Sequence, residues 1–293
     1  MASSDPKFSI ERIEYWIKWL SESFASGKWD SHSLGRGFNF QEIVPYEQAP
    51  DPGLINWPAT LGSYPLEIQV TQYREERNVP VYVLGDLTRS MFFGTDDWLK
   101  QERLALIAAL LAFSVGRSND RLRFIGFSDK AELDFTRSGG DAFPALLAEE
   151  ILRFYPTGGG FGGLVQAAAS VPAYPKALVV IVSDFLGNLS QVEESIQPLA
   201  HRHDLLPIVL WDRAESAWSG GSLPLPVCDA ETGRLIDVFN PKAALARNMA
   251  ALKRKITELF QGYDTEPAFL DQVRESDVDA LISAFFSKRL KAA

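Results

Sequence analysis

Three oxygen-bearing side chains stand on alternate residues directly after an apolar run. The run VPVYVLG occupies residues 79–85, and Asp86, Thr88 and Ser90 follow it. A carboxylate and two hydroxyls with this spacing could hold a small hard cation, because Mg²⁺ and Mn²⁺ prefer oxygen ligands. The same residues could instead place an aspartyl nucleophile, or cap an ordinary Asx or Ser/Thr turn.

A second carboxylate stands in a similar position. Asp184 follows the apolar run ALVVIVS, residues 177–183. Ligands of open α/β sheets bind beyond the carboxyl ends of the strands, near the point where the strand order reverses. If the strands that end at Asp86 and Asp184 are parallel neighbours, their carboxylates converge at that edge. A bound cation or a raised pKa would relieve the repulsion between the two charges.

The elements that must position these residues form an alternating series. Apolar runs predict strands at 79–85, 121–127, 177–183 and 205–211, and helical patterns separate them at 97–115, 141–154, 163–170 and 190–202. Continuous apolar strands that alternate with helices indicate βαβ units and a mostly parallel sheet covered on both faces. The short ELDF at 132–135 is typical of an antiparallel edge strand.

The segments that flank this series have a different texture. Residues 9–26 predict an amphipathic helix, and the scattered glycines, prolines and aromatics of 27–78 predict short strands and turns. Further along the chain, 241–262 and 276–290 predict closing helices, and the proline-rich SLPLPVCD at 222–229 predicts a loop.

Composition and charge exclude several classes of protein. A hydrophobic content of 46% in 293 residues is enough for a packed core, and a net charge of −9 argues against binding to nucleic acid or anionic membranes. The longest apolar run, residues 104–113, is too short to span a bilayer. The single cysteine, Cys228, and an amino terminus without a signal-peptide pattern predict a soluble, cytoplasmic protein.

A glycine-rich stretch offers a third candidate for ligand binding. TGGGFGGLVQAAAS, residues 157–170, leads into a helix whose positive amino-terminal end could face an anion. Gly158, Gly160 and Gly163 formally match a dinucleotide fingerprint. That fingerprint must follow a strand, whereas a helical pattern that ends at Pro156 precedes it here, so nucleotide binding is disfavoured.

These motifs together resemble a known family. Asp86-x-Thr88-x-Ser90 resembles the D-x-S-x-S motif that opens the metal-ion-dependent adhesion site of von Willebrand factor A domains. The following segments appear in the order expected for bacterial von Willebrand A-like proteins of unknown function that accompany MoxR-type AAA+ ATPases: SHSLGRGFNFQEIVPYE (31–47), INWPAT (55–60), YREERNVPVYVLGD (73–86), VSDF (182–185), LAHRHDLLPIVLWD (199–212) and LPLPVCDAETG (223–233).

The resemblance implies a fold, and the changes in sequence texture predict a division of the chain. The fold class is α/β: a Rossmann-like von Willebrand A domain, with a mostly parallel sheet and helices on both faces, plus an N-terminal α/β extension. The extension occupies residues 1–78, the von Willebrand A-like domain occupies 79–240, and C-terminal helices at 241–293 pack on that domain.

The resemblance also implies a metal site. Thr88, in place of the usual serine, and Ser90 would bind Mg²⁺ or Mn²⁺ directly, with Asp86 and Asp184 helping directly or through water. The family's second-loop threonine falls on Gly162, which has no hydroxyl, so we expect weak Mg²⁺ binding.

Aromatic residues beside the predicted site suggest a partner-binding rim. Phe92, Phe93 and Phe161, with Gly162, lie in the adjacent turn and glycine-rich loop, and could surround an acidic side chain of a partner. Alternatively, Phe92 and Phe93 tuck under the helix that follows them.

Two functional hypotheses follow from these residues. The first is a non-enzymatic, chaperone-like binding module that helps a MoxR-type AAA+ ATPase to remodel, mature or load metal into a client protein. The second is a Mg²⁺-dependent phosphoryl-transfer enzyme with Asp86 as nucleophile. Haloacid-dehalogenase-like enzymes usually carry a second acid two residues after the nucleophile, where Thr88 stands here, and we identify no lysine at the third strand end. The first hypothesis is therefore favoured.

Overall fold

The structure is a computed structural model of the chain. It describes residues 34–35, 39–48, 51–74, 80–95, 98–117, 121–137, 142–155, 160–216, 225–228, 235–238 and 241–270. The helices expected at 9–26 and 276–290 lie outside these residues. The chain divides into two compact units, of which the smaller is residues 26–78, and each unit is described by itself.

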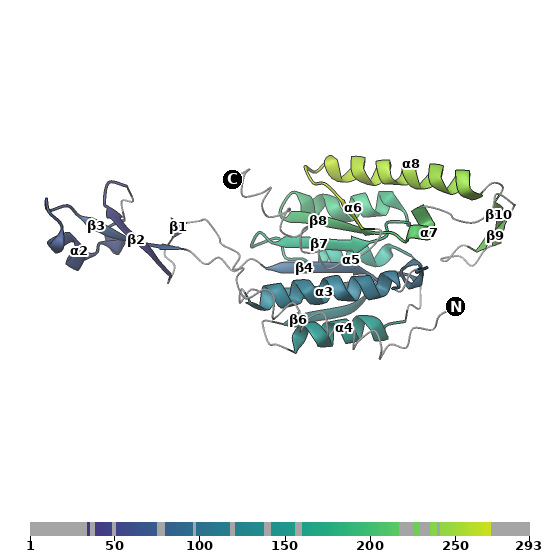
Figure 1. Ribbon diagram of the computed structural model, residues 1–293, viewed down its shortest axis with the longest axis horizontal. Helices are drawn as coiled ribbons and strands as arrows, with labels where there is room; N and C mark the ends of the chain where they lie inside the picture. The colour runs from purple at the N-terminus through teal and green to yellow at the C-terminus, as the bar shows by residue number, and fades with distance from the viewer. Residues whose placement is uncertain are drawn as a thin grey trace. The chain divides into compact units, whose positions relative to one another are not determined.

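The larger unit is built on a six-stranded sheet in the order β11-β8-β7-β4-β5-β6 (Figure 1). The strands are β4 (Val81–Asp86), β5 (Leu122–Phe127), β6 (Ala131–Arg137), β7 (Leu178–Ser183), β8 (Asp204–Leu210) and β11 (Ala268–Leu270). All neighbours are parallel except β5 and β6, because β6 is an antiparallel edge strand. The chain starts the sheet at β4, builds outward to β6, and then returns to place β7 on the other side of β4.

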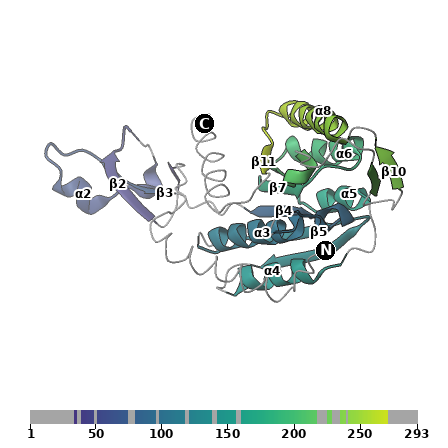
Figure 2. The ribbon, with the colours of Figure 1, turned by 45° about the vertical axis from the view of Figure 1, so that its right-hand side comes forward.

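Helices cover both faces of this sheet (Figures 1 and 2). On one face lie α3 (Lys100–Arg117) and α4 (Phe143–Arg153), and on the other lie α5 (Gly162–Ala169), α6 (Leu189–Ala200) and α8 (Pro241–Gln261). Alternate strand residues serve the two cores: Val180 packs with α3 and α4, whereas Val179 and Ile181 pack with α5, α6 and α8. Residues 104–112 of α3 are all at most 9% exposed, which explains why this helix is apolar on every side.

These elements confirm the predicted α/β class, the four core strands, the helices between them and the antiparallel edge strand. Two short strands were not expected. The prediction of a loop over 222–229 was wrong, because β9 (Leu225–Cys228) pairs with β10 (Leu235–Val238) in a two-stranded ribbon. Pro226 is tolerated there because each strand of such a ribbon pairs on one side only. Among the described residues, no helix is long and apolar enough to cross a membrane.

The smaller unit contains an antiparallel sheet in the order β1-β3-β2, formed by β1 (Leu34–Gly35), β2 (Asn39–Pro45) and β3 (Gln69–Arg74). A 3₁₀ turn, η1 (Pro52–Leu54), and a short helix, α2 (Trp57–Gly62), connect β2 to β3. The Asn56 side chain caps α2 by accepting from the Ala59 N–H at 3.0 Å. The expectation of short strands and turns over 27–78 is therefore confirmed.

Close packing at the centre of the large sheet can be tested at Gly85. A methyl group added there would lie 2.6 and 2.7 Å from ring atoms of Phe124, which is fully buried and held by the core. We expect Gly85→Ala to lower the free energy of unfolding by about 1–3 kcal/mol in chemical denaturation. The control is Gly116→Ala, an exposed helical position with open space around it, where alanine should stabilise by up to about 1 kcal/mol. Equal effects at the two positions would contradict this account of the packing.

Candidate functional site

Two strand ends meet at the carboxyl edge of the sheet. β4 ends at Asp86, and Asp184 directly follows β7, which is its parallel neighbour. The Ser183 hydroxyl donates to Asp86 Oδ2 at 2.5 Å and joins the two strand ends. The predicted adjacency of these strands is therefore confirmed, and it places the two carboxylates where the winding of the sheet reverses, the usual ligand position of such folds.

The turn after β4 gathers its three oxygen-bearing side chains. Thr88 donates to Asp86 Oδ1 twice, from its backbone N–H at 2.8 Å and from its hydroxyl at 2.7 Å. Because the Thr88 hydroxyl proton is used in this way, Ser90 donates to Thr88 Oγ1 at 3.0 Å. All three side chains are buried. The first of these bonds is the turn-capping interaction that the sequence left open as an alternative.

Burial changes the protonation of Asp86. Removal from water, and next the negative charge of Asp184, raise the pKa of Asp86 to about 7. The hydrogen bonds from Ser183 and Thr88 oppose this rise. Near neutral pH, Asp86 therefore exchanges between its neutral and ionised forms.

The site also contains a lysine that the sequence did not reveal. Lys100, the first residue of α3, has a fully buried side chain whose Nζ lies 2.7 Å from Asp184 Oδ2 and 2.8 Å from Glu215 Oε1. Burial alone would lower the pKa of Lys100, but the charges of Asp184 and Glu215 raise it above its usual value. The ammonium group is therefore a permanent cation inside the site.

A third strand end completes this edge of the sheet. Asp212 lies two residues after β8 and accepts from the Thr95 hydroxyl at 2.5 Å and from the Thr95 N–H at 2.9 Å. The Asp212 N–H donates to Glu215 in α7 (Arg213–Ser216) at 2.9 Å. The Trp211 indole N–H donates to the Asp184 carbonyl oxygen at 2.9 Å. The residues after β8 are therefore bonded both to the β4–α3 connection and to the end of β7.

The Asp212 carboxylate stays ionised although it is buried. Burial would raise the pKa of Asp212, but hydrogen bonds from Thr95 and Ala214 and the charge of Arg103 outweigh it, so this pKa falls below its usual value. Arg103 Nη2 lies 3.8 Å from Asp212 Oδ2, and Nη1 donates to the Trp211 carbonyl oxygen. Two basic residues of α3 thus face acidic groups that follow β7 and β8 or lie in α7.

A strained backbone directs Asp184 toward the lysine. Phe185 has φ +52°, in the left-handed region that non-glycine residues rarely adopt. Its N–H donates to the Ser183 hydroxyl, and its ring is fully buried, edge-on to Phe260 of α8 with ring centroids 5.5 Å apart. Asp184 Oδ1 accepts from the Leu186 N–H at 3.1 Å, which leaves Oδ2 facing Lys100.

The glycine-rich loop has a packing role. A Cβ at Gly162 would lie 2.9 Å from the Asp129 carbonyl oxygen, and one at Gly163 would lie 2.3 Å from that of Lys130. Position 162 therefore has little room for the threonine of the adhesion-site pattern. Helix α4 precedes this loop, as the sequence indicated, so the dinucleotide fingerprint lacks the strand that it requires.

The aromatic rim proposed from the sequence is only partly exposed. Phe161 was expected at the rim, but it is 5% exposed, packs edge-on to Phe127 and lies over Gly187, so it cannot serve as an interface anchor. Phe92 is half-buried and contacts Tyr155. Phe93 is 41% exposed, with Lys100 Nζ 5.9 Å from its ring centroid.

These residues do not fit a complete divalent-metal site. Both oxygens of Asp86 and both oxygens of Asp184 already accept hydrogen bonds from protein donors. The ammonium of Lys100 occupies one side of Asp184, and position 162 offers no hydroxyl. Within the described part of the chain, no group of three or more His, Cys, Asp or Glu side chains could hold a metal ion.

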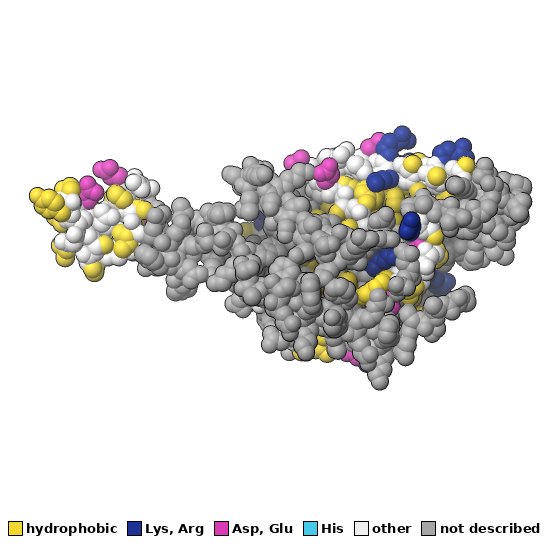
Figure 3. All heavy atoms as spheres, viewed as in Figure 1, with side chains coloured by type: hydrophobic (Ala, Val, Ile, Leu, Met, Phe, Trp, Pro, Cys, Tyr) yellow, Lys and Arg dark blue, Asp and Glu magenta, His cyan; other side chains and the backbone are white. Residues whose placement is uncertain are grey.

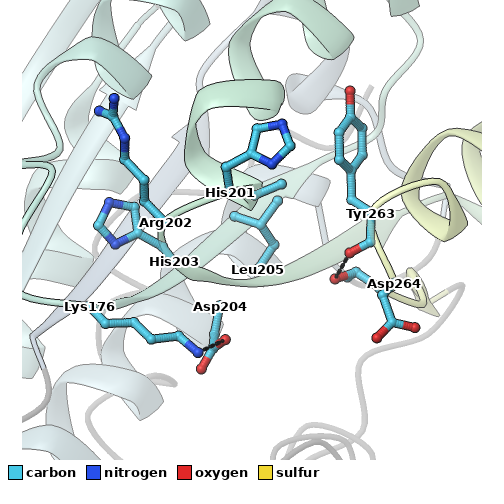
Figure 4. Close-up of a pocket in the computed structure, with 10 residues that line it drawn as sticks. Lys176, His201, Arg202, His203, Asp204, Leu205, Tyr263 and Asp264 are labelled. Carbon is cyan, nitrogen blue, oxygen red and sulfur yellow. Dashed lines mark hydrogen bonds and ion pairs between the residues drawn. The ribbon is translucent and has the colours of Figure 1, made fainter.

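A separate hollow lies at the opposite edge of the sheet, where β7 and β8 begin (Figure 4). Its volume is about 380 Å³, and its lining includes Lys176, His201, His203, Asp204 and Tyr263. Lys176 pairs with Asp204 at 2.9 Å, and His203 Nδ1 accepts from the Ala177 N–H. This hollow shares no residue with the strand-end site.

The strand order and the aspartates at the strand ends define the larger unit as a Rossmann-like α/β domain with a polar site at the carboxyl edge of its sheet. The chain itself belongs to the family described as "Protein of unknown function DUF58", whose pattern matches residues 45–258. No curated protein matches the chain.

Solved structures with similar folds have low sequence identity to this chain. The conserved hypothetical protein BatB from Bacteroides thetaiotaomicron is 14% identical over 73% of this chain and 99% of its own, with a TM-score of 0.47. An aerotolerance-related membrane protein from Bacteroides fragilis is 14% identical over 72% of this chain and 99% of its own, with a TM-score of 0.42. A von Willebrand factor type A protein from Catenulispora acidiphila is 12% identical over 49% of this chain and 35% of its own, with a TM-score of 0.32.

The raised pKa of Asp86 gives the stability of the protein a defined dependence on pH. Between the usual pKa of 3.8 and the folded value of about 7, the folded state binds a proton that the unfolded state lacks. The free energy of unfolding therefore falls as the pH rises through this window. In urea denaturation across this pH window, we expect the free energy of unfolding of Asp86→Asn to fall less steeply than that of the wild type.

Asp134→Asn is the matched control for this measurement. The pKa of Asp134 is lowered, chiefly by its hydrogen bond with Arg123, so its contribution to stability is lost only below its usual pKa of 3.8. This variant should keep the wild-type slope between the usual and folded pKa values of Asp86. A wild-type slope in Asp86→Asn would show that Asp86 is ionised throughout that range.

Proposed function

We propose that this protein is a non-enzymatic protein-binding module that works with a MoxR-type AAA+ ATPase on a client protein. The observation that carries the proposal is an exposed apolar surface on the smaller unit. It consists of Trp57, Leu61, Tyr64, Leu66 and Ile68, which are between 46% and 101% exposed. Figure 3 shows hydrophobic side chains gathered on this unit. A cluster of exposed apolar residues is more often a protein-binding surface than an ordinary part of the solvent-facing surface.

The state of the strand-end site supports a binding role over catalysis. Asp86, Thr88 and Asp184 are completely buried, and a nucleophile must reach its substrate. The carboxylate oxygens of Asp86 accept three hydrogen bonds, and its raised pKa reduces the ionised fraction near neutral pH. These features disfavour phosphoryl transfer through Asp86. They suit a rigid polar centre that holds the surrounding loops in place.

The class of partner is proposed from the ordered motifs that resemble the MoxR-associated proteins. In this role the protein would help the ATPase to remodel or mature its client, or to load a metal into it. The net charge of −9 is consistent with a protein partner and disfavours nucleic acid. Aromatic residues such as Trp57 are typical anchors of such interfaces because they bury a large area with few rotatable bonds.

Binding to the ATPase tests this proposal. We expect the purified full-length protein to bind a MoxR-type AAA+ ATPase of the same organism in surface plasmon resonance, and Trp57→Ala to raise Kd by about tenfold or more. Tyr174→Ala is the matched control, because Tyr174 is an aromatic residue that is 86% exposed on the larger unit. Absence of binding by the wild type would reject the partner class. Equal Kd values for all three proteins would reject the apolar surface as the contact.

The enzymatic alternative makes a separate prediction. Because Asp86 is closed off, we expect no phosphate release from small aryl phosphates in the presence of Mg²⁺ beyond that given by the Asp86→Asn variant. Release that depends on Asp86 would favour the phosphoryl-transfer hypothesis and contradict the binding role.

A further inference from the structure

Lys100 occupies a position that is unfavourable for a positive charge unless that charge is compensated. Its side chain is completely buried, and removing an ammonium group from water is costly. It also begins α3, where the positive end of the helix dipole disfavours a cation. The two carboxylates that contact its Nζ, from Asp184 and Glu215, provide the compensation.

The acidic groups of this edge equally require a cation. Asp184 directly follows β7 and Glu215 lies in α7, and both turn an oxygen toward Lys100 Nζ, at 2.7 and 2.8 Å. Asp212 has its own partners in Thr95 and Arg103. The charge that balances Asp184 is therefore supplied by a side chain of the protein.

The contacts of Asp184 prevent it from binding the Lys100 ammonium group and a metal ion at the same time. Its Oδ1 accepts from the Leu186 N–H at 3.1 Å, and its Oδ2 accepts from Lys100. A metal ion that used Oδ2 would have to displace the ammonium group or lie next to it, and like charges at such short distances repel strongly in a buried site. The fixed backbone at Phe185 limits the rotation that could relieve this conflict.

We propose that the Lys100 ammonium is the resident cation of the strand-end site, and that it holds Asp184 and Glu215 together in place of a divalent metal. The site is then assembled without metal, and the lysine is a second reason, beside the missing hydroxyl at position 162, for a low Mg²⁺ affinity. Removing the positive charge of Lys100 should therefore raise the affinity of the site for divalent cations. This proposal does not depend on the identity of the protein partner.

Titration with Mg²⁺ and Mn²⁺ tests this inference on the full-length protein. We expect Lys100→Met, which keeps the length of the side chain and removes its charge, to bind either ion with a Kd at least about tenfold below that of the wild type in calorimetry. Its unfolding midpoint should rise with added Mg²⁺, because a ligand that binds only the folded state stabilises it. Adding Asp184→Asn to Lys100→Met should abolish both gains.

Two further variants separate this effect from a general change in charge. Lys130→Met removes an exposed lysine that pairs with Glu132 at 3.9 Å, and it should leave the metal Kd at the wild-type value. Lys100→Arg keeps a cation at the site, and it should not gain metal affinity. A gain of the same size in Lys130→Met would show that net charge, and not the position of Lys100, governs metal binding.

The wild type provides an arm that does not require the Lys100 variants to fold. Under the proposal, neither chelator nor millimolar Mg²⁺ shifts its unfolding midpoint. A midpoint that rises with Mg²⁺ in the wild type and loses this rise in Asp86→Ala would overturn the proposal, because the metal would then bind with Lys100 present. A Kd in Lys100→Met equal to or above the wild-type value would overturn it as well.

Discussion

The edge of the sheet where β4, β7 and β8 end is governed by the need to compensate buried negative charge. Parallel strands deliver whatever follows them to one edge, and here an aspartate stands at or just beyond each strand end. Asp86 accepts hydrogen bonds from hydroxyl groups, and Asp184 pairs with an ammonium group. Asp212 accepts from N–H donors and lies near a guanidinium group. The partners of these three carboxylates come from different loops and helices. The connections around this edge are therefore bonded to one another through the three aspartates.

This arrangement bears on the choice between catalysis and binding. A catalytic carboxylate must be reached by substrate, whereas the groups here are enclosed and their oxygens have protein partners. Buried polar networks of this kind rigidify a structure when every member is satisfied. The five exposed apolar residues of the smaller unit lie around α2 and the segment that leads to β3. The larger unit thus provides a rigid α/β body, and the smaller unit provides an exposed apolar surface.

The sequence predicted most of the fold because its signals are local. The core strands are continuous apolar runs, as strands that are buried on both faces must be, and the convergence of Asp86 and Asp184 follows from parallel pairing alone. The same rule would have found Asp212, which follows the run at 205–211. Lys100 could not be found in this way, since its partners lie 84 and 115 residues away and a lysine at a helix start gives no sign of burial. Phe161 was misplaced for a similar reason, because Phe127 and Gly187, which enclose it, come from other loops and strands.

The positive φ at Phe185 sets two demands that no single residue type satisfies. The backbone favours glycine, which would relieve about 1 kcal/mol of strain or more. The core between β7 and α8 favours an aromatic ring, and deleting a buried phenylalanine ring costs about 3–5 kcal/mol. The free energy gained by burying the ring exceeds the cost of the strain, so position 185 tolerates a phenylalanine in a strained conformation. Phe260, 75 positions further along the chain, therefore helps to fix the direction of the Asp184 carboxylate. A substitution at that helical position would act on the polar site indirectly, through the ring of Phe185.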